Sequence, residues 1–96
     1  MKALPAGAHV YKSTAEFTEA TIPAGLLRAH VTKPGVWGRL VVSEGTLLYR
    51  IVGAGEEWVL DPETPGVIEP EVPHEVAVLG PVRFRVEFSR VDDSQG

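Results

Sequence analysis

The stretch Val82-Arg83-Phe84-Arg85-Val86-Glu87-Phe88-Ser89-Arg90 decides the fold class, because apolar and polar residues alternate along it. Side chains of a β-strand point alternately to its two faces. From position 82 to 89, the even-numbered residues therefore form an apolar face and the odd-numbered residues a polar, mostly charged one. This pattern predicts a strand over 82–90 with one buried face.

The rest of the chain consists of short segments of similar character. Ten glycines and eight prolines separate them, and Val, Leu, Ile and aromatic residues recur inside them without a sustained helical period. These segments predict six further strands, at 26–32, 36–43, 46–52, 56–60, 66–69 and 74–79. Glu44-Gly45 is expected to be the turn of a hairpin between the second and third of them.

Only one segment carries a helical signal. Ser13 and Glu16 have the spacing of a capping box, but the run ends near Pro23, so a turn or two of helix is expected close to the N-terminus. Seven short strands separated by turn residues predict an all-β sandwich or closed barrel.

Length and composition limit the class of protein. The 96 residues predict one domain, over 1–91, followed by a frayed polar tail at 92–96. The chain has no cysteine, so any metal must be held by imidazole, carboxylate, water or backbone oxygen. A net charge of −4 without a basic run argues against nucleic acid as a partner. Without an apolar stretch long enough for a bilayer or a signal peptide, we expect no membrane contact and a cytoplasmic location.

Two histidines are the candidate site residues. His74 follows Pro70 and Pro73 and begins a predicted strand, and His30 belongs to another strand far upstream. If Val76, on the same face as His74, points inward, the imidazole also points inward and needs a partner. That partner could be a metal, a carboxylate or a backbone carbonyl.

The chain resembles the small cupin-type domains of the tellurite-resistance protein B-like group, over nearly its whole length. The segments that carry the resemblance are His30, Gly35 to Leu40, Glu44 to Leu47, Pro70 to His74, and Val86 to Phe88. The resemblance implies a double-stranded β-helix (a jelly-roll barrel) with an inward-facing pocket, often paired as a homodimer. It implies no defined reaction.

Relative to the wider cupin pattern, two of the usual four metal ligands are missing. Thr32 stands where a second histidine is usual, and Trp37 lies near the place of the usual glutamate. A reduced site is therefore expected, with His30 and His74 as imidazole ligands. The carboxylate would come from Glu87, Glu71 or Glu57. Such a set would suit zinc, iron, manganese or nickel.

Trp37 and Arg39 are further candidates, for ligand binding. They share a strand face, and if that face lines the pocket, Arg39 could hold a small anion. The alternatives are a core tryptophan and an exposed arginine. Likewise, Glu87 could be a solvated partner of Arg85, and either histidine could be satisfied by protein groups alone.

Three functional hypotheses follow. The first is a small-molecule or oxyanion binding or sensing protein with a reduced metal site, linked to tellurite or nitrogen-oxide stress. The second is a metal-dependent enzyme of the oxygenase or isomerase type. The third is a metal-free structural homodimer. No Gly-rich loop opens a helix, so no nucleotide cofactor is expected.

Overall fold

The computed structural model describes residues 1–91, so the predicted tail at 92–96 lies outside the described part of the chain. The strands form one antiparallel sheet in the order β1-β6-β3-β4, with β2 also paired to β6 and β5 also paired to β3. The elements are β1 (Ala8–Ser13), β2 (Phe17–Thr18), the 3-10 helix η1 (Ala24–Leu27), β3 (Val36–Ile51), β4 (Glu56–Leu60), β5 (Gly66–Ile68) and β6 (His74–Val91).

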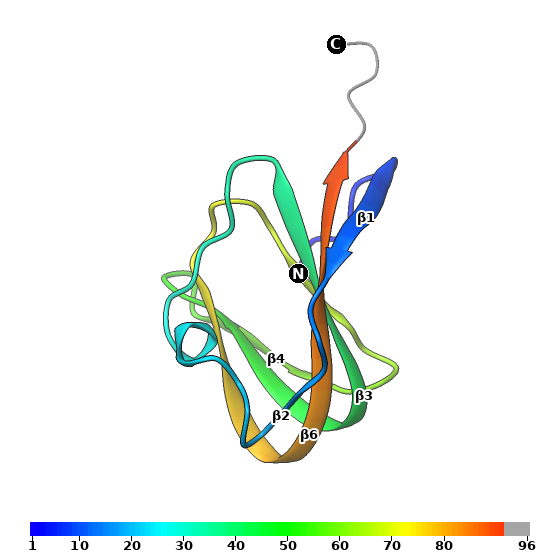
Figure 1. Cartoon of the computed structure of the whole chain (residues 1–96). Coiled ribbons are helices and arrows are strands. Elements are labelled where there is room, and N and C mark those ends of the chain that lie inside the picture. The colour runs from blue at the N-terminus through cyan, green and yellow to red at the C-terminus, as the bar shows by residue number, and fades with distance from the viewer. Residues whose placement is uncertain (92–96) are drawn as a thin grey trace.

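Two long strands, β3 and β6, organise the fold. They pair with each other along almost their whole length, and both bend near the middle, so that the two halves of the sheet face each other (Figure 1). The pairing register shifts on either side of Glu44 and Gly45, and such β-bulges increase the local bend of a strand. Gly45 has a φ of 80°, and a Cβ atom there would lie 2.1 Å from the carbonyl oxygen of Pro81. The bend therefore requires glycine at this position.

The core lies between the two halves of the bent sheet. Its fully buried members come mainly from alternate positions of β3 and β6, as the sequence pattern predicts. Phe84 is completely buried and meets Phe17 of β2 edge-on, with 5.6 Å between ring centroids. The buried cluster consists of Leu40, Val42, Leu47, Tyr49, Leu60, Ile68, Val76, Val82, Phe84 and Val86.

The structure confirms the all-β class, but it does not confirm a double-stranded β-helix. The predicted hairpin turn at Glu44-Gly45 is wrong, because β3 continues through it. The predicted strands at 74–79 and 82–90 are likewise one strand, β6. The residues near Gly45 and Gly80, where the sequence pattern predicts turns, lie at β-bulges instead. Each strand therefore bends at this point but does not reverse its direction.

The N-terminal third differs more from the prediction. The expected strand at 26–32 is replaced by η1 and an irregular segment, and the expected helical turn near Ser13 is absent from the described structure. Ser13 instead ends β1, a strand that the sequence pattern did not predict. Thr14 accepts a hydrogen bond from the backbone amide of Val86 through its hydroxyl. Pairing with β6 therefore overrides the local capping signal. No helix within residues 1–91 is long and apolar enough to cross a membrane.

Candidate functional site

His30 and His74 lie together, as predicted. The backbone amide of each histidine donates a hydrogen bond to the carbonyl of the other, at N···O distances of 2.7 and 2.9 Å. The two rings meet edge to face, with 5.3 Å between centroids. An irregular segment and the first residue of β6 thus bring the two imidazoles into one site.

The environment of His74 favours its neutral form. Burial lowers the pKa of His74, the nearby His30 contributes in the same direction, and the Nδ1 contact with the carbonyl of Val72 opposes them. That Nδ1 atom lies 3.2 Å from the carbonyl oxygen and can only donate to it. A neutral imidazole that donates through Nδ1 presents Nε2 as an acceptor.

Three polar atoms around this site are buried without a hydrogen-bond partner in the described part of the chain. They are Nε2 of His74, Nδ1 of His30 and Oγ1 of Thr32. Buried polar atoms in proteins almost always have partners, so each unpaired atom calls for an explanation. A ligand or ion that reaches them would supply one.

The predicted carboxylate ligands do not join the histidines. Glu87 lies on the polar face of β6 and accepts a hydrogen bond from Arg85 at 2.9 Å, and Glu57 does the same from Arg50 at 3.1 Å. Glu71 is exposed, in a loop position with a φ of 64°. Within residues 1–91, no three His, Asp or Glu side chains are grouped closely enough to hold a metal. The histidines therefore supply two imidazoles and no carboxylate.

Trp37 and Arg39 lie on the opposite face of β3 from its inward-facing residues. Val36, Gly38 and Leu40 point into the molecule and are buried, whereas Arg39 is exposed and Trp37 is half-buried. Neither residue lines the pocket described in the next paragraph. The polar face of β3 therefore does not line it.

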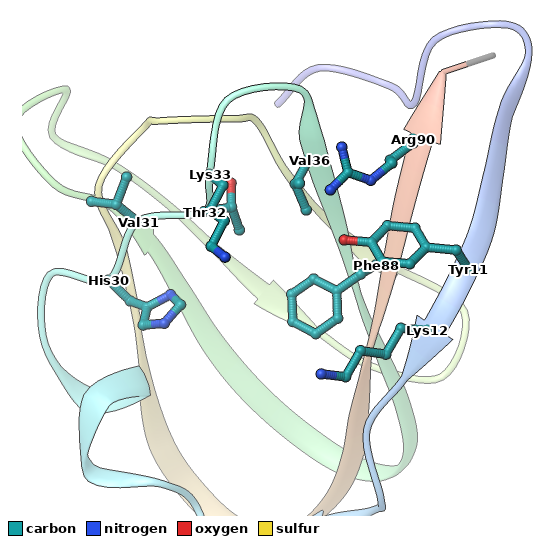
Figure 2. Close-up of a pocket in the computed structure, with 9 residues that line it drawn as sticks. All are labelled: Tyr11, Lys12, His30, Val31, Thr32, Lys33, Val36, Phe88 and Arg90. Carbon is teal, nitrogen blue, oxygen red and sulfur yellow. The ribbon is translucent and has the colours of Figure 1, made fainter.

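This pocket, of about 450 Å³, opens beside His30 (Figure 2). One wall is the segment His30 to Lys33, and the other is formed by β1 and the end of β6. We call it the cationic pocket; its lining residues are Tyr11, Lys12, His30, Val31, Thr32, Lys33, Val36, Phe88 and Arg90.

Positive charge dominates the polar lining. Lys12, Lys33 and Arg90 all border the cationic pocket, and no Asp or Glu of residues 1–91 does. None of these three cations forms a salt bridge to a carboxylate anywhere in residues 1–91. The guanidinium carbon of Arg90 lies 5.0 Å from the centroid of the Tyr11 ring, a cation–π contact that orients it.

A bulge in β1 turns two consecutive side chains toward the cationic pocket. Val10 pairs with Ser89 and Lys12 with Phe88, so Tyr11 is an extra residue in the ladder. Neighbouring side chains of a regular strand point to opposite faces, but a bulge re-aims one of them. Figure 2 shows that both Tyr11 and Lys12 reach the pocket.

Sequence reasoning missed the cations of this pocket, although one signal was present. Arg90 continues the even-numbered, apolar face of β6 one step beyond Phe88, so it lies at the end of an inward-facing row. A charged residue that follows the alternation of a buried, apolar strand face is a candidate for lining a pocket. The position of Lys12 depends on the bulge, which no turn residue marks.

The geometry defines this protein as an all-β domain with a cation-lined pocket next to a pair of histidines, of which His74 is buried. The chain belongs to the TehB-like domain family, whose model matches residues 12–86. This confirms the predicted resemblance to tellurite-resistance protein B-type domains. The cupin part of the resemblance is not confirmed.

Two solved structures share the fold. A crystal structure of a protein from E. coli (strain K12) has a TM-score of 0.86 at 24% identity, and the match covers 97% of this chain and 100% of that one. TehB from Haemophilus influenzae has a TM-score of 0.79 at 26% identity, over 90% of this chain. The present chain spans 32% of that TehB chain. No curated protein matches the sequence significantly.

Proposed function

We propose that this protein binds a small anion in the cationic pocket. The observation that carries the proposal is that Lys12, Lys33 and Arg90 gather there without an acidic partner in residues 1–91. The chain as a whole has a net charge of −4, so the positive charge around this pocket is opposite in sign to the net charge of the protein. Cations around a concave site attract anionic ligands and raise their local concentration.

A role in the response to tellurite or nitrogen oxides fits this chemistry. Membership of the TehB-like family supports the link to tellurite. Tellurite, nitrite and nitrate are all small oxyanions that Arg and Lys side chains could bind through charge-assisted hydrogen bonds. The protein would then act as a binding or sensing module, and these three anions are the first probes to use.

Isothermal titration calorimetry tests the proposal. Each of Arg90→Gln and Lys12→Gln is expected to weaken anion binding at least about fivefold, because each removes a charge-assisted contact. Arg39→Gln is the matched control, since it removes an exposed arginine from the other face of β3. If Arg39→Gln weakens binding and the pocket variants do not, the anion binds on the polar face and the proposal is wrong.

A metal ion at the histidine pair is a second candidate, favoured by the unpaired Nε2 of His74 and Nδ1 of His30. Zinc, iron, manganese and nickel all accept imidazole ligands. Two imidazoles fill only part of a coordination sphere, so water or a bound anion would have to complete it. An oxygenase or isomerase activity would depend on such a metal.

Metal analysis by mass spectrometry tests this candidate on untagged protein. Near one equivalent in the wild type that disappears in both His30→Ala and His74→Ala would support it, with His9→Ala as the control for an exposed histidine. A wild type that takes up none of the four metals would remove it. The homodimer and the cytoplasmic location remain predictions.

A further inference from the structure

We infer that the anion that the cationic pocket binds most tightly is an organic acid with an aromatic or bulky aliphatic body and a second, uncharged polar group, and that inorganic oxyanions bind there more weakly. This inference rests on the proposed function and names its ligand class. It follows from the size of the pocket, its apolar lining and the place of its unpaired polar atoms.

The volume of the pocket exceeds the needs of an inorganic ion. A water molecule takes about 30 Å³ of liquid volume, so an oxyanion of four or five heavy atoms would fill a small part of about 450 Å³. Pockets of this size typically hold organic ligands. An inorganic ion bound to one of the cations would leave most of the lining uncovered.

Much of that lining is apolar. The rings of Phe88 and Tyr11 lie near Lys12 and Arg90 (Figure 2), and Val31 and Val36 also line the pocket. Apolar walls add no binding energy for a hydrated inorganic ion, whereas they stabilise the apolar part of an organic ligand. Each methylene group of a ligand that is buried against such walls is worth about a fourfold gain in affinity.

The wall formed by His30 to Lys33 adds neutral polar groups. Thr32 is only 6% exposed, and its hydroxyl oxygen has no hydrogen-bond partner in the described residues. Nδ1 of His30, on the same wall, is also unpaired. Across the pocket lie Lys12 and Arg90 (Figure 2). A ligand that places its carboxylate toward these cations can offer a hydroxyl to the opposite wall.

Calorimetric titrations with matched probes test this ligand class. The probes are 4-hydroxybenzoate, benzoate, the neutral benzamide, acetate, nitrate and tellurite. We expect 4-hydroxybenzoate to bind at least about tenfold more tightly than acetate, nitrate or tellurite, and benzamide to lose most of the affinity of benzoate. Thr32→Val keeps the side-chain volume and removes the hydroxyl, so it should weaken 4-hydroxybenzoate about fivefold and leave benzoate unchanged.

The outcomes separate the inference from the function on which it rests. If nitrate or tellurite binds as tightly as the aromatic acids and Arg90→Gln weakens it, the anion site stands and the organic ligand class is wrong. If Thr32→Val weakens both aromatic acids equally or neither of them, the second polar group is wrong. If none of the anions binds, the proposed function fails together with the inference.

Discussion

His30 and His74 exchange two backbone hydrogen bonds, at 2.7 and 2.9 Å, and thereby hold the segment before β3 against the first residue of β6. A further hydrogen bond runs from the amide of Glu71 to the carbonyl of Thr32, at 3.2 Å. The segment that contains Glu71 and His74 therefore holds in place the wall of the cationic pocket that carries Thr32 and Lys33. The histidine pair positions the pocket whether or not it also holds an ion.

The stability of the protein should fall as the pH drops below about 6.5, the ordinary pKa of histidine. Burial lowers the pKa of His74 in the folded protein, so between its unfolded and folded pKa values the unfolded chain binds more protons. One such proton changes the free energy of unfolding by up to about 1.4 kcal/mol per pH unit. Urea unfolding at pH 8, 7, 6 and 5 in the presence of EDTA measures this slope.

Two variants show whether His74 causes the slope. His74→Gln should flatten it between pH 7 and 5, whereas His9→Gln, which changes an exposed histidine, should leave it unchanged.

Hydrogen bonds from Ser43 to Glu16 and from the amide of Val82 to Glu19 lower the pKa of these carboxyls from 4.5. Their contribution to stability is lost only below that value, outside this window. An unchanged slope in His74→Gln would contradict the account.

Gly45→Ala should destabilise the protein far more than Gly53→Ala. Both glycines have a positive φ, of 80° and 89°, so alanine is strained at either site. At Gly45 the new Cβ atom would also meet the carbonyl oxygen of Pro81 at 2.1 Å, whereas nothing lies within 4 Å at Gly53. We expect a loss of about 1 kcal/mol at Gly53 and at least about 3 kcal/mol at Gly45. Equal losses in thermal unfolding would show that β3 does not bend here.

Thr32→Val should stabilise the protein without ligand by about 1 kcal/mol, because it replaces a buried hydroxyl that has no partner with a methyl group of similar size. Thr64→Val, at an exposed position, is the control and should change the free energy of unfolding little. Chemical unfolding measures both. A loss of stability in Thr32→Val would mean that the hydroxyl makes a structural hydrogen bond, and it would remove one support for the organic ligand.

Tyr49 should remain un-ionised in the folded protein until very high pH. Burial, with a smaller contribution from Glu69, raises the pKa of Tyr49 to about 12, and its hydroxyl donates a hydrogen bond to the carbonyl of Val67 at 2.8 Å. An ultraviolet titration should therefore show a tyrosine with a strongly raised pKa that Tyr49→Phe removes. The same variant should lose about 1 kcal/mol of stability. Two tyrosines that both titrate near pH 10 in the folded protein would contradict the burial of Tyr49.

The alternating pattern predicted the second half of β6, because burial of one face leaves a period of two in the sequence. It could not distinguish a turn from a bulge at Gly45, since glycine suits both and the choice depends on the approach of Pro81 from the other strand. Pairing of β1 with β6 was missed for a similar reason. Five of the six residues of β1 are exposed, so its sequence carries little trace of burial.

The candidate site was predicted in part. The sequence raised the possibility that His30 and His74 meet, and the structure brings them together. The carboxylates could not be assigned from the sequence, because Arg85 and Arg50 compete for Glu87 and Glu57. The cationic pocket depends on the bulge at Tyr11 and on where the segment His30 to Lys33 lies. Both are tertiary features without a local signal.

The most direct test of the central claim is an NMR titration of ¹⁵N-labelled protein with 4-hydroxybenzoate, nitrate and tellurite. At least one anion should shift the amide signals of residues 30–33 and 88–90. A variant combining Lys12→Gln, Lys33→Gln and Arg90→Gln should lose these shifts, while Arg39→Gln should keep them. Shifts centred on Arg39 and Trp37, or no saturable shifts with any of the three anions, would contradict the claim that this pocket is the anion site.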